Sequence, residues 1–197
     1  MASNVIEMKC PGCGNRVTTS QTVCEFCHGP ITISTFNSVY SMPMPQVNQY
    51  AKVYRETLAQ APDDQILNTS LAMCYLKLKL YDKALVAFEK AIEDNFDNSE
   101  TFFYAAVCLL KGKKAFLAMR TTINQIEEYI QAALMIEPKG IYYYFWAYIK
   151  YDYYSRKYLN TSPNWQEALG QAEQYGLSPF DIEQLYGVLG VERPSCL

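Results

Sequence analysis

Four cysteines near the start of the chain form two close pairs. The first pair is Cys10 and Cys13, the second is Cys24 and Cys27, and two residues lie inside each pair. Two thiolates at this spacing can bind one metal ion from a single turn, and a second such pair completes a tetrahedron. Because so short a segment cannot bury much apolar surface, a bound metal would stabilise its fold. The spacing therefore predicts one structural Zn²⁺ ion held by these four residues.

The chain offers little for catalysis. Four thiolates leave no open coordination position for a substrate or an activated water. The one histidine, His28, follows Cys27 directly and could replace a cysteine, lie behind the ligands or be an exposed loop residue. The acid pairs Asp63–Asp64 and Glu127–Glu128 fit a helix start and a solvated helix face. We therefore expect a protein that is not an enzyme.

Length and composition narrow the class of protein. The chain has 197 residues, a formal charge of -3 and 50% hydrophobic residues, which suits one ordinary domain and a small one. This charge gives no general attraction to nucleic acid or to anionic membranes. The sequence contains neither a signal-peptide pattern nor an apolar run long enough for membrane insertion. Reduced cysteines together with zinc predict a cytoplasmic protein.

Short strands are expected to position the cysteine pairs. Val17–Thr19 and Ile31–Phe36 are rich in β-branched residues, which favour strands. The segment CPGCGNRVTTSQTVCEFCHGPI resembles the short zinc ribbons at the N-termini of many bacterial proteins, and the resemblance lies in the cysteine spacing. We expect a zinc ribbon over residues 1–36. Its acids and bases balance, which argues against nucleic-acid binding.

Residues 37–47 (NSVYSMPMPQV) are predicted to form a linker. Pro43 and Pro45 disfavour both helix and strand pairing there. The apolar side chains of this segment, Tyr40 among them, suggest that it lies along a surface rather than free in solvent.

From residue 48 onward the sequence pattern is helical. Small and large residues alternate at helical spacing within Leu71–Tyr75 and again within Ala84–Ala91, with a turn at Leu80–Asp82. Small residues let two helices approach closely, and aromatic residues fill the space between them. This helix pair resembles a tetratricopeptide repeat.

Two further copies of the pair follow. The second begins with Phe102–Leu109, and the third contains Tyr144–Tyr151 and Trp165–Tyr175. Segments 111–120 and 155–162 make these copies longer than the family pattern.

Flanking helices complete the predicted architecture. Tyr50–Pro62 resembles the second helix of a repeat, and Ser178 can cap a last helix, Pro179–Leu189. The expected fold class is mostly α, with a tetratricopeptide-like α-solenoid of about three helix pairs and flanking helices in residues 48–197, preceded by a small β zinc ribbon.

The resemblance implies a concave groove, built from the first helices, that holds an apolar peptide or a partner helix. The partner-binding side chains that it implies are Met73, Leu76, Phe103, Val107, Leu110, Tyr142, Phe145, Ile149 and Tyr153. The lysines and asparagines of the family's chaperone-binding members are absent. The chain's own linker is another candidate occupant. The same residues could also be ordinary core, because periodicity does not separate groove from core.

Two local clusters remain. The run Ile141–Tyr148 is almost wholly aromatic and is expected to pack mostly between helices, with Tyr143 and Tyr154 on a recognition surface. The segment Lys111–Arg120 carries four cations, and no acid lies between Glu100 and Glu127. It could contact a phosphate or an acidic partner, or be a solvated loop.

These observations predict a protein–protein interaction adaptor or scaffold with a structural zinc ribbon. Two alternatives remain open. One is a nucleic-acid-associated regulatory protein that uses the zinc ribbon. The other is a self-assembling structural subunit, a homo-oligomer joined through tyrosine-rich helix faces.

Overall fold

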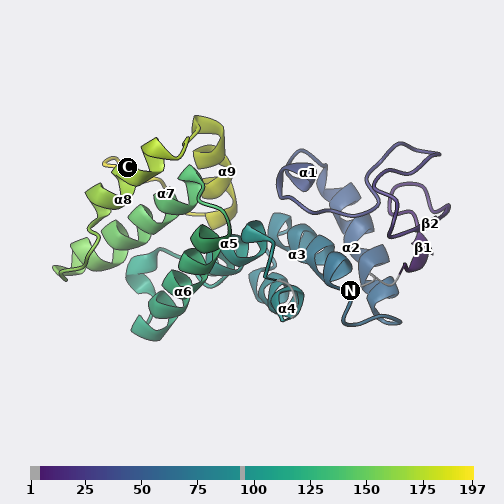
Figure 1. The fold of residues 1–197 in the computed structure, drawn as a ribbon, viewed down its shortest axis with the longest axis horizontal. Coiled ribbons are helices and arrows are strands. Elements are labelled where there is room, and N and C mark those ends of the chain that lie inside the picture. The colour runs from purple at the N-terminus through teal and green to yellow at the C-terminus, as the bar shows by residue number, and fades with distance from the viewer. Residues whose placement is uncertain (1–4, 94–95) are drawn as a thin grey trace. The chain divides into compact units, whose positions relative to one another are not determined.

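The computed structural model describes residues 5–93 and 96–197. By packing, the chain forms two compact units, Met1–Asn95 and Phe96–Leu197. The described part is mostly helical with one two-stranded sheet (Figure 1), so the predicted class, mostly α with a small β element, is confirmed. The predicted domain boundaries after residues 36 and 47 do not coincide with the division between these two units, which falls after Asn95. They remain predictions.

The first unit begins with the only paired strands of the described residues. β1 (Glu7–Lys9) runs antiparallel to β2 (Arg16–Thr18), with Met8 opposite Val17. Both of these side chains are buried, while most of their neighbours on the two strands point to solvent. The sheet positions the first cysteine pair, which lies between its strands in the sequence.

The second predicted strand, Ile31–Phe36, is wrong. Residues 31–36, here called the strap, form no strand, yet Ile31, Ile33 and Phe36 are fully buried. The Tyr54 hydroxyl donates to the carbonyl of Ile31 at 2.9 Å, and the Ser70 hydroxyl accepts from the N–H of Ile33 at 2.8 Å. Side chains of two helices therefore satisfy backbone groups that a neighbouring strand would otherwise pair.

The segment predicted as a linker is largely helical. It contains α1 (Asn37–Tyr40) and the start of α2 (Met44–Leu58). Pro43 is the N-cap of α2 and Pro45 lies in its first turn, where a missing N–H removes no helical hydrogen bond. The two prolines therefore begin a helix instead of preventing one.

The first predicted helix pair is confirmed, although the turn predicted at Leu80–Asp82 lies earlier, because the second helix already begins at Tyr81. α3 (Gln65–Lys77) and α4 (Tyr81–Ile92) pack closely together, and α2 packs on α3. Asp64 caps α3 by accepting a hydrogen bond from the N–H of Leu67 at 2.7 Å. The small residues Ala72 of α3 and Ala84 of α4 are fully buried.

The second unit contains the other predicted pairs. α5 packs on α6 and α7 packs on α8, while α9 contacts both α5 and α7. The bounds of these helices are α5 (Ser99–Cys108), α6 (Arg120–Ile136), α7 (Gly140–Ile149), α8 (Trp165–Gln174) and α9 (Pro179–Leu189). Ser178 caps α9 as predicted, accepting from the N–H of Asp181 at 3.1 Å.

The two predicted insertions have local structure of their own. A 3₁₀ turn, η1 (Ala115–Leu117), lies between α5 and α6. The last turn of α7 widens into a π-helical turn, η2 (Lys150–Tyr154), which is followed by a second 3₁₀ turn, η3 (Ser155–Lys157). π-Helical turns inside α-helices are rare and often occur at functional sites.

The aromatic run of α7 packs mostly inward. Tyr144 and Tyr148 are buried and meet the ring of Tyr186 from α9 edge-on, at centroid distances of 6.3 and 6.0 Å. Gly140 allows α7 to approach α8 closely, because a Cβ there would lie 2.6 Å from the carbonyl oxygen of Ala172 in α8. These contacts agree with the expectation that most of the run packs between helices.

Candidate metal centre and surface pocket

The four predicted metal ligands come together in the first unit. The Sγ atoms of Cys10, Cys13, Cys24 and Cys27 all lie within 4.8 Å of one another, and these residues could hold a metal ion. Cys10 Sγ lies 3.6 Å from Cys27 Sγ, and Cys13 Sγ lies 3.7 Å from Cys24 Sγ. Each of these close contacts joins one cysteine of the first pair to one of the second.

Equivalent backbone turns place the two pairs. The N–H of Gly14 donates to the carbonyl of Cys10 at 2.9 Å, and the N–H of His28 donates to that of Cys24 at 2.9 Å. Both donors have positive φ, 83° for Gly14 and 57° for His28. His28 is exposed and lies outside the cysteine cluster, so among its three interpretations the structure favours the exposed loop residue.

The thiols differ in their environments. Burial raises the pKa of Cys10 to about 12, so a metal ion bound there must displace a proton. The backbone amides of Cys27 and Phe26 lower the pKa of Cys24 to about 7. The second turn therefore presents one thiol that ionises readily near neutral pH.

The side chain of Tyr50 in α2 packs against the two turns that carry the cysteines. Its side chain is fully buried, and its hydroxyl has no hydrogen-bond partner of good geometry among the described residues. A Cβ built on Gly29 would lie 3.0 Å from this hydroxyl and 3.6 Å from Cys27 Sγ. A Cβ on Gly12 would likewise lie 3.4 Å from the hydroxyl and 3.1 Å from Cys27 Sγ. The two glycines thus let the cysteine turns close onto the phenol.

The tyrosine remains protonated in this position. Burial, together with the nearby thiols of Cys10 and Cys27, raises the pKa of Tyr50 to about 12, while the side chain of Gln46 acts in the opposite direction. A neutral phenol beside the sulfur atoms can donate a hydrogen bond but adds no negative charge.

The nine predicted groove residues are all buried. Met73 and Leu76 belong to the first unit, and the other seven, Phe103, Val107, Leu110, Tyr142, Phe145, Ile149 and Tyr153, belong to the second. This burial agrees with the alternative interpretation, in which these nine residues are ordinary core. A partner-binding role for these residues remains a prediction, and so does one groove that spans all the helix pairs.

The chain itself covers one face of α3. Ser70, Met73 and Lys77 follow one another at helical spacing on that face. The strap binds Ser70 through the N–H of Ile33. The ammonium of Lys77 donates to the carbonyl of Tyr40 in α1 and lies 4.5 Å from the centre of the Tyr40 ring. The strap and part of the predicted linker therefore lie where the resemblance implied a partner.

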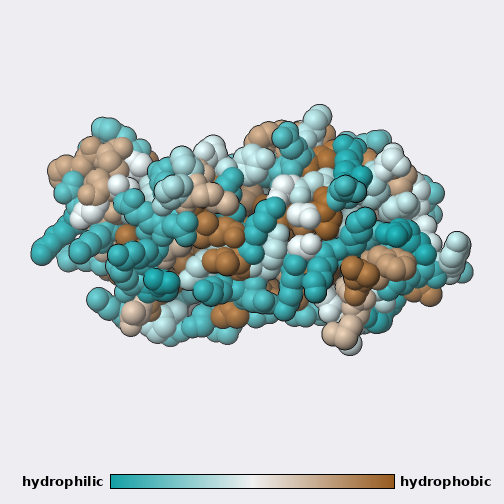
Figure 2. All heavy atoms as spheres, turned by 180° about the vertical axis from the view of Figure 1, so that it is seen from behind, coloured by the Kyte–Doolittle hydropathy of each residue, from teal (hydrophilic) through white to brown (hydrophobic). Residues whose placement is uncertain are grey.

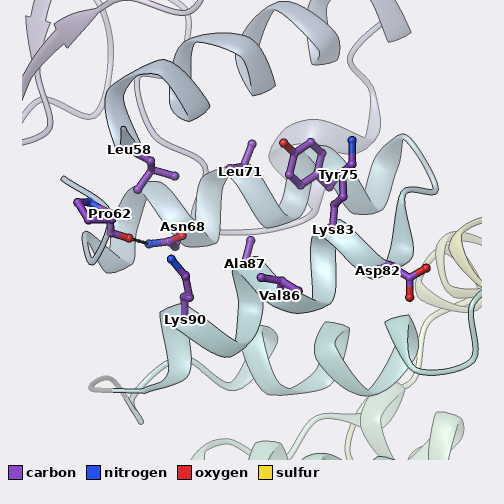
Figure 3. A pocket seen from close by; sticks show the side chains of 10 residues that line it. All are labelled: Leu58, Pro62, Asn68, Leu71, Tyr75, Asp82, Lys83, Val86, Ala87 and Lys90. Carbon is purple, nitrogen blue, oxygen red and sulfur yellow. Dashed lines mark hydrogen bonds between the residues drawn. The ribbon is translucent and has the colours of Figure 1, made fainter. Parts of the chain in front are cut away.

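A different face of α3 lines a surface pocket of about 490 Å³ (Figure 3). Figure 3 shows Leu71 and Tyr75 along α3, Leu58 at the end of α2, and Val86 and Ala87 on α4. These side chains make the pocket mainly apolar. Val86 is 57% exposed, so an apolar surface is open to solvent there.

Charged side chains surround this apolar surface. Asp82, Lys83 and Lys90 of α4 line the pocket, which gives its rim a net positive charge. Lys83 and Lys90 are two helical turns apart on the same side of α4, about 10.5 Å along its axis. Asn68 contributes polar lining and is fixed by a hydrogen bond from its amide to the carbonyl of Pro62 at 2.8 Å (Figure 3).

Sequence reasoning missed a buried ion pair in the second unit. Glu127, expected on a solvated face, lies 2.6 Å from the ammonium of Lys150, whose side chain is 5% exposed. Trp146 Nε1 and the Tyr154 hydroxyl also donate to Glu127, at 3.0 and 2.5 Å. Burial raises the pKa of Glu127, but hydrogen bonds from Lys150, Tyr154 and Trp146 outweigh this effect, so its pKa lies below the usual value. Tyr154, expected on a recognition surface, is buried here.

Comparisons with known proteins identify no family. No family model and no curated protein matches the chain. The structure "MamA MSR-1 C2" is 21% identical, with 66% of this chain and 67% of that chain covered and a TM-score of 0.49. "MamA AMB-1 P212121" is 19% identical, with 74% and 82% covered and a TM-score of 0.49.

No helix within residues 5–93 and 96–197 combines the length and the apolar character that crossing a bilayer requires.

The packing of the cysteine turns against Tyr50 can be tested by a double-mutant cycle. Gly29→Ala places a methyl group against the buried Tyr50 hydroxyl and should destabilise the protein by about 1–3 kcal/mol. Tyr50→Phe removes that oxygen, so the double variant should regain much of the loss in denaturant unfolding. Gly14→Ala is the control, because its φ of 83° strains alanine with no atom within 4 Å of the new Cβ. If Gly29→Ala lowers the free energy of unfolding equally in the wild-type protein and in the Tyr50→Phe variant, this packing is contradicted.

The buried ion pair gives a second test. Glu127→Gln leaves Lys150 without its carboxylate and should lower the free energy of unfolding by about 3 kcal/mol. Glu128→Gln changes the exposed neighbour and should stay within about 0.5 kcal/mol of the wild type.

Because the folded pKa of Glu127 lies below the ordinary value of 4.5, its stabilisation is complete above that pH. It should be lost as the pH falls through the lower folded value, and urea unfolding along a pH series measures this. Identical pH profiles for Glu127→Gln and the wild type would contradict the assignment.

Proposed function

We propose that this chain is a non-enzymatic protein-interaction module with a tetratricopeptide-like helical body and a structural zinc ribbon. The observation that carries the proposal is the pocket between α2, α3 and α4, which opens an apolar surface beside two lysines. The face shown in Figure 2 is mostly hydrophilic, and its apolar residues lie in separate groups.

The chemistry of the pocket selects its occupant. The lining of Leu58, Leu71 and Val86 favours an aliphatic or aromatic side chain. Lys83 and Lys90 favour carboxylates near that side chain. A short peptide segment with an apolar residue flanked by Asp or Glu meets both requirements. The volume of about 490 Å³ suits one or two side chains better than a whole helix.

Zinc is the metal that we assign to the cysteine cluster. A tetrahedral ion with metal–sulfur bonds of about 2.3 Å places its ligands about 3.8 Å apart. Two of the six Sγ–Sγ distances, 3.6 and 3.7 Å, match this spacing, and all six are within 4.8 Å. Thiolates are soft ligands that select zinc or iron over harder cations. With all four positions taken by protein, such an ion would stabilise the turns and leave no place for a substrate.

The zinc assignment predicts one zinc ion per chain in elemental analysis of the purified protein. Cys13→Ser should lose most of the metal, because it removes one of the four ligands. Cys196→Ser is the matched control, since Cys196 is also an exposed free cysteine but lies in the other unit. Iron in place of zinc, or equal metal content in the two variants, would contradict the assignment.

The pocket predicts a defined peptide specificity. Selection from a random peptide library displayed on phage should enrich sequences that join an apolar residue to Asp or Glu. Synthetic copies should bind the protein in fluorescence anisotropy. Val86→Arg fills the pocket and should weaken this binding by about tenfold or more.

Val5→Arg provides the control for this experiment. Val5 is an exposed valine of the same unit that does not line the pocket, and its substitution should leave peptide affinity unchanged. Failure to enrich any such peptide, or equal affinity of the Val86 and Val5 variants, would overturn the proposed binding site.

A further inference from the structure

The loop between α5 and α6 exposes apolar side chains among cations. Leu117 is 69% exposed and Met119 is 73% exposed. Lys113 and Lys114 precede them and Arg120 follows, all three exposed. We name Lys111–Arg120 the basic loop. Burying such apolar groups against a partner releases free energy, so their exposure beside like charges points to a binding surface.

Buried groups of the second unit hold this loop in place. The N–H of Phe116 donates to Asp152 Oδ2 at 2.8 Å, and the N–H of Ala115 lies 3.4 Å from the accepting hydroxyl of Tyr148. Asp152 is only 2% exposed and belongs to the π-helical turn η2. The widened turn thus places a buried carboxylate under the loop, and the loop presents its apolar side chains from a fixed backbone.

Further cations extend the same surface. The guanidinium of Arg156 and the ammonium of Lys157 lie 4.6 and 5.1 Å from the centre of the Phe116 ring. Arg156 also neutralises the carboxylate of Asp152, with Nη1 and Oδ1 at 2.5 Å. The loop sequence itself contains no acid. The surface around Leu117 and Met119 is therefore positively charged.

We propose that the basic loop binds the surface of an anionic lipid bilayer, with Leu117 and Met119 inserted among the acyl chains and the surrounding cations at the headgroups. A bilayer accepts projecting apolar side chains at any position, and it supplies many negative charges at once. Nucleic acid would satisfy the cations but not the two apolar side chains. This proposal does not depend on the α2–α3–α4 pocket or on the metal centre.

Vesicle flotation of the full chain tests the proposal. Vesicles of phosphatidylcholine with about 30% phosphatidylserine should carry the protein at about 0.1 M salt, whereas phosphatidylcholine alone should not. Lys113→Gln with Lys114→Gln should weaken binding by about thirtyfold, from about 1 kcal/mol for each cation. Leu117→Ser with Met119→Ser should weaken it by about tenfold or more, because both apolar side chains are lost.

Matched controls separate the loop from general effects. Met135→Ser changes another exposed methionine of the second unit, and Lys52→Gln with Lys79→Gln removes two exposed cations elsewhere. Both control proteins should bind vesicles like the wild type. Absence of wild-type binding to the anionic vesicles would overturn the proposal. So would binding that the Leu117 and Met119 substitutions leave unchanged, since charge alone would then explain it and nucleic acid or an acidic protein would be the better partner.

Discussion

The first unit depends on the burial of a small cysteine module against two helices. The module has a sheet of two short strands and too few apolar residues for a core of its own. Tyr50 supports the cysteine turns, while Tyr54 and Ser70 bind the backbone of the strap. α3 carries the strap on one face and lines the pocket with another, so the strap and the pocket share one helix.

The second unit uses buried charge for a similar purpose. The π-helical turn at the end of α7 brings Lys150 to Glu127 and Asp152 to the backbone of the loop before α6. An isolated buried charge is strongly unfavourable, so each of these groups restricts the arrangements that the turn can adopt. The gain is a defined position for the loop rather than large net stability.

The sequence predicted features that depend on nearby residues. Cysteine spacing located the four-cysteine cluster that could hold a metal ion, and small residues at helical intervals located the α3–α4 pair. The Ser178 cap followed from a single residue. Features decided by distant partners were missed. The strap has the β-branched composition of a strand, but Tyr54 and Ser70 take its hydrogen bonds. Glu127 resembles a surface acid because its partner, Lys150, lies on another helix. Pro45 resembles a helix breaker because its position in the first turn is not visible from composition.

The burial of the predicted groove residues has a physical explanation that also directs attention to other surfaces. In the first unit the strap and α1 cover the face of α3 on which Met73 lies, and they form hydrogen bonds with Ser70 and Lys77. A partner on this face would have to displace these hydrogen bonds. Such displacement costs more than binding to a surface that is already open. The pocket beside Val86 and the basic loop beside Leu117 are open and carry cations next to apolar groups. The recognition proposed for this chain therefore rests more directly on the residues that its helices leave exposed than on those that they pack together.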